Sequence, residues 1–553
     1  MKITKPNQPI VFFAAALVIS LFLAYSNTFT APFIFDDAIN IVENASIRQL
    51  WPPWMPFDIP SDTGIASRPV VNFTLAANFA LSGMDPWSYH AANLIIHILA
   101  ALMLFGIMIR ISSSPEMMDG AAAVPLSFVC ALLWGLHPIQ TQAVTYVSQR
   151  CESLMALFVL ATYCCALRGW QSESPRGWHL TAVMLFLLAV FSKEVAAVAP
   201  FILFTHEWVF LGRSPLRAVR RSPLLYAGIA LGILMLGLAT LHGNTLVLRT
   251  ERNTFTPVSY WLTQFPVIVH YIRLMIWPSG LVIDYGWPAM TLKEAWPSVA
   301  VIMSLVVLSG WAVWRRKAAG FWGAWFFFFL APSSLVPLPD IAFEHRMYLP
   351  SAAIVILIGG MAVHLYERAK VRENNFVIFK MVPALPAFIA IGLCLGLILG
   401  RSTYERNRDY QSEMAIWSDT IQKRPENFRG YHGVASVLSK EGKLGQALAY
   451  MSTAVRLNPQ NPYVYNDAGC MLFTLNRAAD AIPYFRESIR IKPGNVKAHN
   501  NLGAALAQTG QLREAVRHFS EAVRIKPDYA EARNNLKKAS IALERSPYQA
   551  GCR

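Results

Sequence analysis

The sequence carries little charge for its length. Only 15% of its 553 residues are charged, while 54% are hydrophobic. Soluble proteins carry about 25% charged residues. Apolar runs of roughly 17–25 residues, each long enough to cross a bilayer, recur as far as Arg401. A fully soluble chain is therefore excluded, and we expect a large membrane domain followed by a small polar one.

Cysteine is also scarce. The seven cysteines show no C-x-x-C pair and no metal-ligand spacing, and Cys164 and Cys165 lie in an apolar run. A disulfide framework and a cysteine-based metal centre are excluded on this pattern. The adjacent pair is interpreted as packing rather than redox chemistry.

The N-terminal apolar run lacks a convincing small-residue cleavage site. We therefore interpret residues 10–25 as part of an uncleaved first span rather than as a signal peptide. The net charge of +15 would suit a nucleic-acid partner. However, the basic residues cluster in short loops between spans, where they set orientation, and no nucleic-acid partner is expected.

About eleven spans are predicted, with the N-terminus in the cytoplasm. This choice places the densest basic stretches on the inside, including Arg213–Arg221 and Arg315–Lys317. Residues 257–278 contain His270 and Arg273 and are expected to lie on the outer face. The predicted spans are 10–26, 90–110, 121–140, 153–168, 179–192, 195–211, 223–241, 296–314, 319–336, 347–366 and 382–400.

An odd number of spans puts the C-terminal domain outside the cytoplasm. Charged and histidine side chains at span ends then gather on that same side, which suggests a site at the outer membrane surface. The alternative is a set of solvated loop ends. The residues concerned are Asp36, Asp37, Arg68, His90, His137, Arg150, Glu152, Lys193, Glu194, Asp284, Glu344, His345 and Arg346.

The polar C-terminal domain repeats with a period of 34 residues. Pro425, Pro459, Pro493 and Pro527 recur at this spacing, together with small and aromatic positions typical of tetratricopeptide (TPR) repeats. We predict an all-α architecture. Its domains are a membrane domain over 1–402 with a large first loop at 27–89, a linker and half repeat over 403–426, three repeats over 427–528, and a capping helix and tail over 529–553.

Paired amide side chains recur on the first helix of each repeat. Amides both donate to and accept from a peptide backbone, so the pattern predicts a groove for polypeptide. Ordinary surface polarity is the alternative. The residues are Asn466, Asp467, Asn500, Asn501, Asn534 and Asn535.

The first outer loop holds the strongest local signal, FIFDDAINIVENASI at 33–47. The carboxylates Asp36 and Asp37 suit a general base, a metal ligand or a structural cap. Paired aspartates are able to hold a hard cation, but no further acidic residue is spaced to complete its ligand shell. No metal or other cofactor is therefore expected.

Five segments in order resemble the TMTC family, the transmembrane, TPR-containing O-mannosyltransferases of the GT-C superfamily. The segments are FIFDDAINIVEN, SRPVVNFTLAANFALSGMDPWSYHAANLIIH, HPIQTQAVTYVSQRCESL, FSKEVAAVAP and FEHRMYLPS. The resemblance implies transfer of mannose or a similar hexose from a polyprenyl-phosphate lipid in the membrane to Ser or Thr hydroxyls of an acceptor polypeptide, which the TPR array would bind.

The resemblance also implies residue roles. Asp36 or Asp37 would act on the acceptor, without a decision between them. Arg346 and His345 would bind the lipid phosphate, with Lys193, Arg150 and Arg68 in reserve. Further contacts to donor or acceptor are expected from His90, His137, Glu152, Glu194 and Glu344. The alternative role for each of these basic residues is that of an anchor at the membrane surface. The alternative role for His137 is that of a helix cap.

Two features depart from the family pattern. Gln142 stands where an acidic residue is expected in many relatives, and the repeat array is short. A bacterial inner-membrane protein with a periplasmic array is favoured, with an ER membrane location as the alternative. The other hypotheses are a GT-C transferase acting on a lipid or polysaccharide and a non-catalytic membrane scaffold. The sequence shows no inverted repeat that would indicate a transporter.

Overall fold

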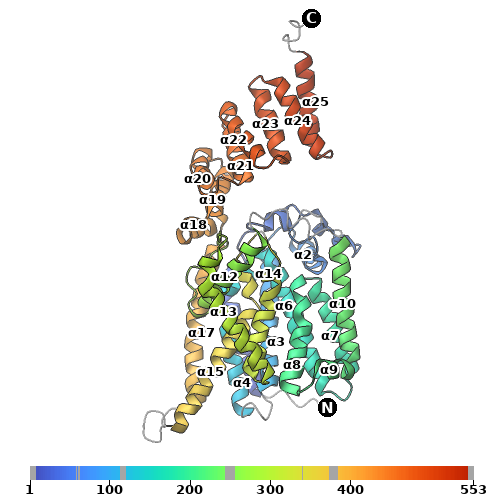
Figure 1. Cartoon of the computed structure of the whole chain (residues 1–553), viewed down its shortest axis with the longest axis vertical. Coiled ribbons are helices and arrows are strands. Elements are labelled where there is room, and N and C mark those ends of the chain that lie inside the picture. Colours follow the sequence, from blue (N-terminus) through green and yellow to red (C-terminus); the bar gives the residue numbers. More distant parts are fainter. Residues whose placement is uncertain are drawn as a thin grey trace. The chain divides into compact units, whose positions relative to one another are not determined.

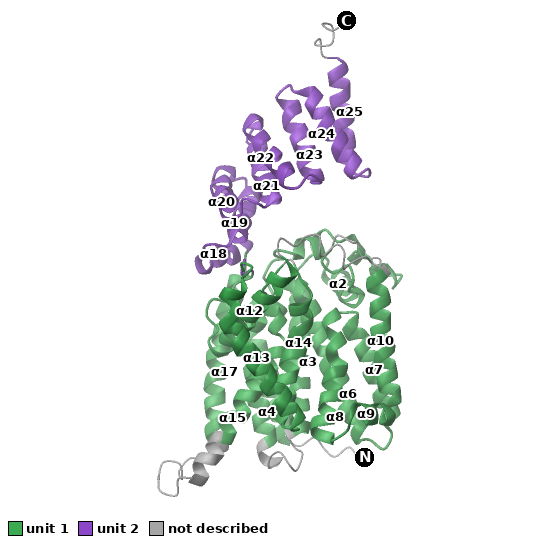
Figure 2. Cartoon of the chain, in the orientation of Figure 1, with its two compact units in different colours: residues 1–283, 287–412 green, residues 284–286, 413–553 purple. Residues whose placement is uncertain are grey.

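The computed structural model describes residues 8–545 except 58, 60–62, 113–119, 243–255, 339 and 373–383. These residues form helices and no strand, which confirms the all-α prediction. The chain divides into two compact units (Figure 2). The membrane unit comprises residues 1–283 and 287–412, and the repeat unit comprises residues 284–286 and 413–553. Each unit is described by itself below.

The membrane unit is a bundle of helices joined by short irregular segments (Figure 1). Several helices begin with proline in their first turn, where the missing N–H is not needed. The helices are α1 (Gln8–Tyr25), α2 (Pro69–Ser82), α3 (Trp87–Ser112), α4 (Gly120–Gly135), α5 (Thr141–Val144), α6 (Arg150–Gln171), α7 (Pro175–Val190), α8 (Ala199–Leu211), α9 (Pro215–Arg221), α10 (Pro223–His242), α12 (Pro257–Ile276), α13 (Leu292–Trp314), α14 (Ala318–Leu335), α15 (Pro350–Arg372) and α17 (Ala384–Asp409).

Each of the eleven predicted spans coincides with a helix, but not all of these helices are long. Within the described residues, 8 helices are long and apolar enough to cross a membrane, or up to 9 if one bent pair counts as a single span. That pair, Ala123–Gly135 and Pro138–Val144, bends by 53°. α7 and the apolar stretch Pro350–His364 are shorter than a full crossing.

A buried histidine joins α3, α4 and the turn before α15. His97 on α3 places Nδ1 2.7 Å from the Tyr348 hydroxyl and Nε2 3.0 Å from the Gly135 carbonyl. The Trp134 indole donates to the Tyr348 carbonyl at 2.9 Å. Every polar atom of the histidine ring therefore has a partner inside the protein, as a lipid-enclosed core requires.

α12 packs one face along the end of α14 and the loop after it. Tyr260 donates to the Ser333 carbonyl at 2.5 Å, and Trp261 donates to the Leu335 carbonyl at 2.8 Å. α12 is not among the helices apolar enough to span. The outer-face position of residues 257–278 remains a prediction.

The first and last helices of the membrane unit meet at one end of the bundle. Asn407 on α17 donates to the Ala24 carbonyl at 3.1 Å and to the Asn27 side chain at 3.2 Å. Asn27 in turn donates to the Tyr404 carbonyl at 2.8 Å. α17 therefore ends on the face of the membrane unit where the first loop begins.

The repeat unit is built from successive helix pairs. The predicted repeats correspond to α19 with α20, α21 with α22, and α23 with α24, while α18 is the half repeat and α25 the cap. Residues 546–553 of the predicted tail lie outside the described residues. The helices are α18 (Glu413–Lys423), α19 (Phe428–Lys440), α20 (Leu444–Leu457), α21 (Pro462–Thr474), α22 (Ala478–Ile491), α23 (Val496–Gln508), α24 (Leu512–Ile525) and α25 (Ala530–Glu544).

Asparagine caps the first helix of each repeat. The side chains of Asn427, Asn461 and Asn495 accept backbone N–H groups at the starts of α19, α21 and α23. Asn427 also donates to Asp284 at 3.0 Å, and Arg429 pairs with the same carboxylate at 2.5 Å. Asp284, predicted to stand with the outer-surface cluster, thus belongs to the repeat unit.

Glycine allows close packing within the second and third repeats. A Cβ added at Gly469 would lie 2.6 Å from the Phe485 ring, and one at Gly503 would lie 2.8 Å from the Phe519 ring. Both rings are buried. The 34-residue period of small and aromatic residues therefore reflects contacts between an aromatic ring on the second helix of a repeat and the backbone of the first.

We expect Gly503→Val to destabilise the repeat unit by about 1–3 kcal/mol, because the added atoms overpack the contact with Phe519. Gly445→Ala is the control, since a Cβ there meets no atom within 4 Å. Hydrogen exchange of α23 and α24 in the full-length protein measures the effect. Equal protection in the two variants would contradict this packing argument.

Candidate active site

One segment, residues 142–152, contacts four of the charged motifs that the sequence placed on the outer side. We call it the connecting segment. It follows the bend between α4 and α5 and ends in the first turn of α6. Its contacts pair Gln142 with His345, Tyr146 with Asp36, Ser148 with Asp37, Cys151 with Arg68 and Glu152 with Lys193.

Asp37 is buried and its carboxylate is occupied by protein donors. Ser148 donates to Oδ1 from its backbone N–H at 2.7 Å and from its hydroxyl at 2.5 Å, and the Ile34 N–H donates to Oδ2 at 3.1 Å. Burial raises the pKa of Asp37 to about 7, although these hydrogen bonds act to lower it. Asp37 therefore anchors the first loop to the connecting segment.

Asp36 is only partly buried, and it follows a strained residue. Phe35 has φ of 50°, a left-handed conformation that a bulky residue rarely adopts. The Asp36 N–H donates to the Tyr146 hydroxyl at 3.0 Å, and the same hydroxyl hydrogen-bonds to the Asp36 side chain. Burial, together with Asp36 and Asp37, raises the pKa of Tyr146 well above its usual value, so the phenol stays protonated. Asp36 is the carboxylate of the pair that retains exposure.

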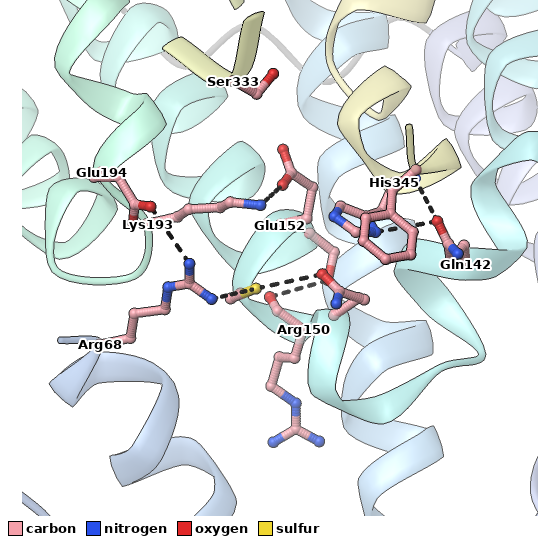
Figure 3. Close-up of polar contacts among 12 residues, drawn as sticks. Arg68, Gln142, Arg150, Glu152, Lys193, Glu194, Ser333 and His345 are labelled. Carbon is pink, nitrogen blue, oxygen red and sulfur yellow. Dashed lines mark hydrogen bonds and ion pairs between the residues drawn. The ribbon is translucent and has the colours of Figure 1, made fainter. Parts of the chain in front are cut away.

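Two ion pairs, one buried and one partly exposed, lie side by side next to the connecting segment (Figure 3). Lys193 pairs with Glu152 on α6, and both side chains are largely buried. Arg68 lies 3.5 Å from Glu194 and donates to the Cys151 sulfur at 3.4 Å. An unpaired buried charge would be costly, and each of these two cations has an acidic partner.

The motif before α15 brings two more basic side chains to the cluster. Arg346 donates to the Ile341 carbonyl at 2.8 Å and to the Asp340 carbonyl at 2.6 Å. His345 is held by Gln142 (Figure 3). Burial, with Lys193, Arg346 and Arg68 nearby, lowers the pKa of His345 well below its usual value. The ring is therefore neutral and does not add a positive charge, contrary to the role expected from the sequence.

Arg150 does not join the cluster. Its guanidinium points away from Lys193 and His345 in Figure 3 and is fully buried. It donates to the side chains of Asn93 and Asn78, each at 2.6 Å, and to the Tyr89 carbonyl at 2.9 Å. The phosphate contact expected from the sequence is thus corrected, because all three nitrogens of this arginine pack α2, α3 and α6 together.

Three other predicted residues are buried and bonded to the backbone. His90 Nε2 lies 2.9 Å from the Ala31 carbonyl. His137 Nδ1 accepts the N–H of Ile139 at 3.2 Å, so this histidine caps the turn at Pro138, the second of the two roles weighed for it. Glu344 is buried and accepts the Val282 N–H at 2.7 Å. These contacts fix backbone segments around the cluster.

The asparagines of the repeat unit bond to one another. Asn501 donates to Asn466 at 3.0 Å, and Asn535 donates to Asn500 at 3.0 Å, each bond joining two consecutive repeat positions. Asn466 and Asn500 are buried, which corrects their expected role in an open peptide groove. Asp467 lies 2.8 Å from His432, and Asn534 is exposed.

Sequence reasoning missed the uncharged residues that assemble the site. Tyr146 and Ser148 lie inside a quoted motif but carry no charge, so no charge pattern could single them out. Asn40 donates to the Ser148 hydroxyl at 3.1 Å, and Asn44 donates to Asn72 at 3.0 Å. The polar residues in an otherwise apolar loop and helix were the available signal.

Replacing Arg150 by Met is expected to lower the thermal stability of the full-length protein in detergent. Its loss leaves buried acceptors without donors, at about 1–3 kcal/mol for each. Arg110→Met at the far end of α3 is the control, since that guanidinium lies 3.9 Å from the Cys164 sulfur. Equal melting temperatures for the two variants would contradict the packing role.

Comparison with known proteins supports both units. Two family models described as tetratricopeptide repeat match residues 435–496 and 472–539. The first TPR of Spaghetti (RPAP3), solved with an HSP90 peptide, matches 21% of this chain and 93% of its own, with 24% identity and a TM-score of 0.21.

Curated relatives match most of the chain. Protein O-mannosyl-transferase F38B6.6 of Caenorhabditis elegans is 23% identical over 460 residues, covering 77% of this chain and 60% of the relative. Protein O-mannosyl-transferase TMTC3 of Homo sapiens is 22% identical, covering 77% of this chain and 49% of the relative. The chain spans about half to 60% of the length of these relatives. It is a relative of the TMTC-type protein O-mannosyltransferases and carries tetratricopeptide repeats at its C-terminal end.

Proposed function

We propose that the protein is a membrane glycosyltransferase that moves a hexose, mannose or a similar sugar, from polyprenyl phosphate to Ser or Thr hydroxyls of an extracytosolic protein. The observation that carries this proposal is the convergence of four of the motifs on the connecting segment, which belongs to the fifth. Asp36 and the basic cluster, distant in sequence, contact the same eleven-residue stretch, 142–152. The relatives named protein O-mannosyl-transferases support the reaction class.

Asp36 is assigned the role of general base. The Asp36 side chain is partly exposed and is oriented by the Tyr146 hydroxyl. Asp37, in contrast, accepts hydrogen bonds from Ser148 that hold the fold together. In the proposed reaction the acceptor oxygen forms a bond to the anomeric carbon, and its proton passes to Asp36. The bond from the anomeric carbon to the phosphate oxygen breaks, and its electron pair leaves with the lipid phosphate. A single displacement of this kind inverts the anomeric centre.

The leaving phosphate is assigned to Lys193, Arg68 and Arg346. The Lys193–Glu152 and Arg68–Glu194 pairs lie side by side next to the connecting segment, and Arg346 follows His345 directly in the chain. Their carboxylate and carbonyl partners hold them in fixed positions before the donor arrives. Preorganised charge of this kind stabilises a developing anion without reorganisation during the reaction.

The two ends of α8 support the proposed orientation in the membrane. Lys193 and Glu194 precede this helix, while Arg213 follows it and pairs with Glu207 at 3.0 Å. The basic stretch Arg213–Arg221 and the candidate site therefore lie at opposite ends of one helix. By the positive-inside rule the site faces the extracytosolic side, and so does the end of α17 that leads into the repeats. We propose the bacterial periplasm for that side, with the ER lumen as the alternative.

Asp36→Asn is expected to reduce sugar transfer from polyprenyl-phosphate-mannose about 10²–10⁴-fold, because the amide cannot take the acceptor's proton. The melting temperature should stay close to that of the unsubstituted protein, since Asp36 is partly exposed. Transfer is measured with radiolabelled donor and a Ser/Thr-containing acceptor. Asp37→Asn is the contrasting variant and should lower stability together with activity.

If Asp36→Asn transfers sugar at the unsubstituted rate, Asp36 is not the general base. Transfer that falls equally in both variants with equal losses of stability would show that the two carboxylates act only in folding.

Deletion of residues 427–553 is expected to separate chemistry from acceptor recruitment. Transfer to a short peptide should survive, because Asp36 and the basic cluster belong to the membrane unit. Transfer to a folded protein acceptor should fall if the array binds it. Equal transfer to the protein acceptor by both forms would favour a docking role for the array.

A further inference from the structure

The side-chain amide of Gln142 has one determined orientation. Its Oε1 accepts the backbone N–H of His345 at 2.8 Å, and its Nε2 donates to the Ile283 carbonyl at 2.8 Å. A backbone N–H can only donate and a carbonyl can only accept. The hydrogen-bond partners therefore distinguish the oxygen of this amide from its nitrogen.

This orientation determines the tautomer of His345. The ring nitrogen Nδ1 lies 3.1 Å from the same Gln142 oxygen, which can only accept. Nδ1 must therefore carry a proton, and the neutral ring holds its lone pair on Nε2. The ring also stacks on Phe343 with a centroid distance of 5.1 Å, which limits its rotation. Within the described residues, no hydrogen bond is made to Nε2.

Burial and the charges around the ring keep it neutral. Burial lowers the pKa of His345 most, and Lys193, Arg346 and Arg68 lower it further. The nearby carboxylates Glu152 and Glu194 are already paired with Lys193 and Arg68, and Glu344 accepts a backbone N–H from Val282.

The lone pair on a neutral Nε2 interacts differently with the sugar and with the phosphate of a sugar phosphate. The phosphate of a phosphodiester offers only acceptor oxygens and would meet lone-pair repulsion at this atom. A sugar hydroxyl offers a proton and would form a hydrogen bond. His345 is therefore suited to the sugar, and the neighbouring cations are suited to the phosphate.

We propose that Gln142 is a positioning residue that holds His345 as the Nδ1–H tautomer, so that Nε2 accepts a hydrogen bond from a hydroxyl of the donor sugar. The proposal rests on the proposed function and divides its donor site into two parts. Lys193, Arg68 and Arg346 bind the phosphate, and the Gln142–His345 pair recognises the sugar.

Binding of two lipids to the full-length protein in nanodiscs tests the division. The probes are polyprenyl-phosphate-mannose and polyprenyl phosphate without sugar. His345→Leu should weaken binding of the mannose lipid about tenfold, the effect of one lost hydrogen bond, and leave binding of the sugar-free lipid nearly unchanged. Gln142→Leu should act in the same direction, because the ring loses its fixed tautomer. Gln171→Leu, at an exposed position on α6, is the matched control and should bind both lipids normally.

Two amide variants keep the test independent of folding defects. In His345→Gln the longer side chain places an amide oxygen near the former Nε2, whereas His345→Asn offers an amide only near the former Nδ1. Gln should therefore restore binding of the mannose lipid better than Asn does. Melting temperatures of both variants are compared with that of the unsubstituted protein.

Specific outcomes would overturn the inference. If His345→Leu weakens both lipids equally, or weakens the sugar-free lipid more, His345 binds phosphate and the division is wrong. Restoration by Asn as good as by Gln would show that only the contact to Gln142 matters. If the unsubstituted protein binds both lipids but Lys193→Met and Arg68→Met change neither affinity, the proposed phosphate site itself fails, a result distinct from the two above.

Discussion

The hydrogen bonds between Ser148 and the buried Asp37 carboxylate hold the two halves of the site together. A carboxylate enclosed by protein is tolerated only when donors inside the fold replace water. Ser148 provides two of these donors from a segment more than a hundred residues away. Once this connection is made, Asp36 and Tyr146 are placed next to one another, and the strained conformation of Phe35 is held by contacts on either side.

The same requirement organises the rest of the membrane unit. Arg150 satisfies acceptors on α2 and α3, His97 joins α3 to α4 and Tyr348, and Asn407 joins α17 to α1. In a low-dielectric bundle such bonds are specific because a slipped helix would leave buried groups unpaired. The polar residues within apolar helices are thus divided between those that position the bundle and those that face the candidate site.

The chemistry of the basic cluster depends on how its charges are distributed. Lys193 and Arg68 each have a carboxylate partner, while His345 stays neutral beside them. The cluster therefore offers positive charge and a hydrogen-bond acceptor within one site. That combination matches a donor whose phosphate is anionic and whose sugar is rich in hydroxyl groups.

The sequence alone determined the features that have a one-dimensional signature. Span length and apolar composition indicated the membrane helices, and the 34-residue period indicated the repeats, because both depend on local chain geometry. The charged outer residues were also recognisable as a group, since membrane spans confine polar side chains to their ends. Only the tertiary structure decided their individual roles. Asp36 and Asp37 are neighbours in sequence but differ in burial, Arg150 points away from the cluster, and the repeat asparagines bond to each other. Each of these outcomes depends on which distant donor or acceptor reaches the side chain, and sequence spacing does not encode that.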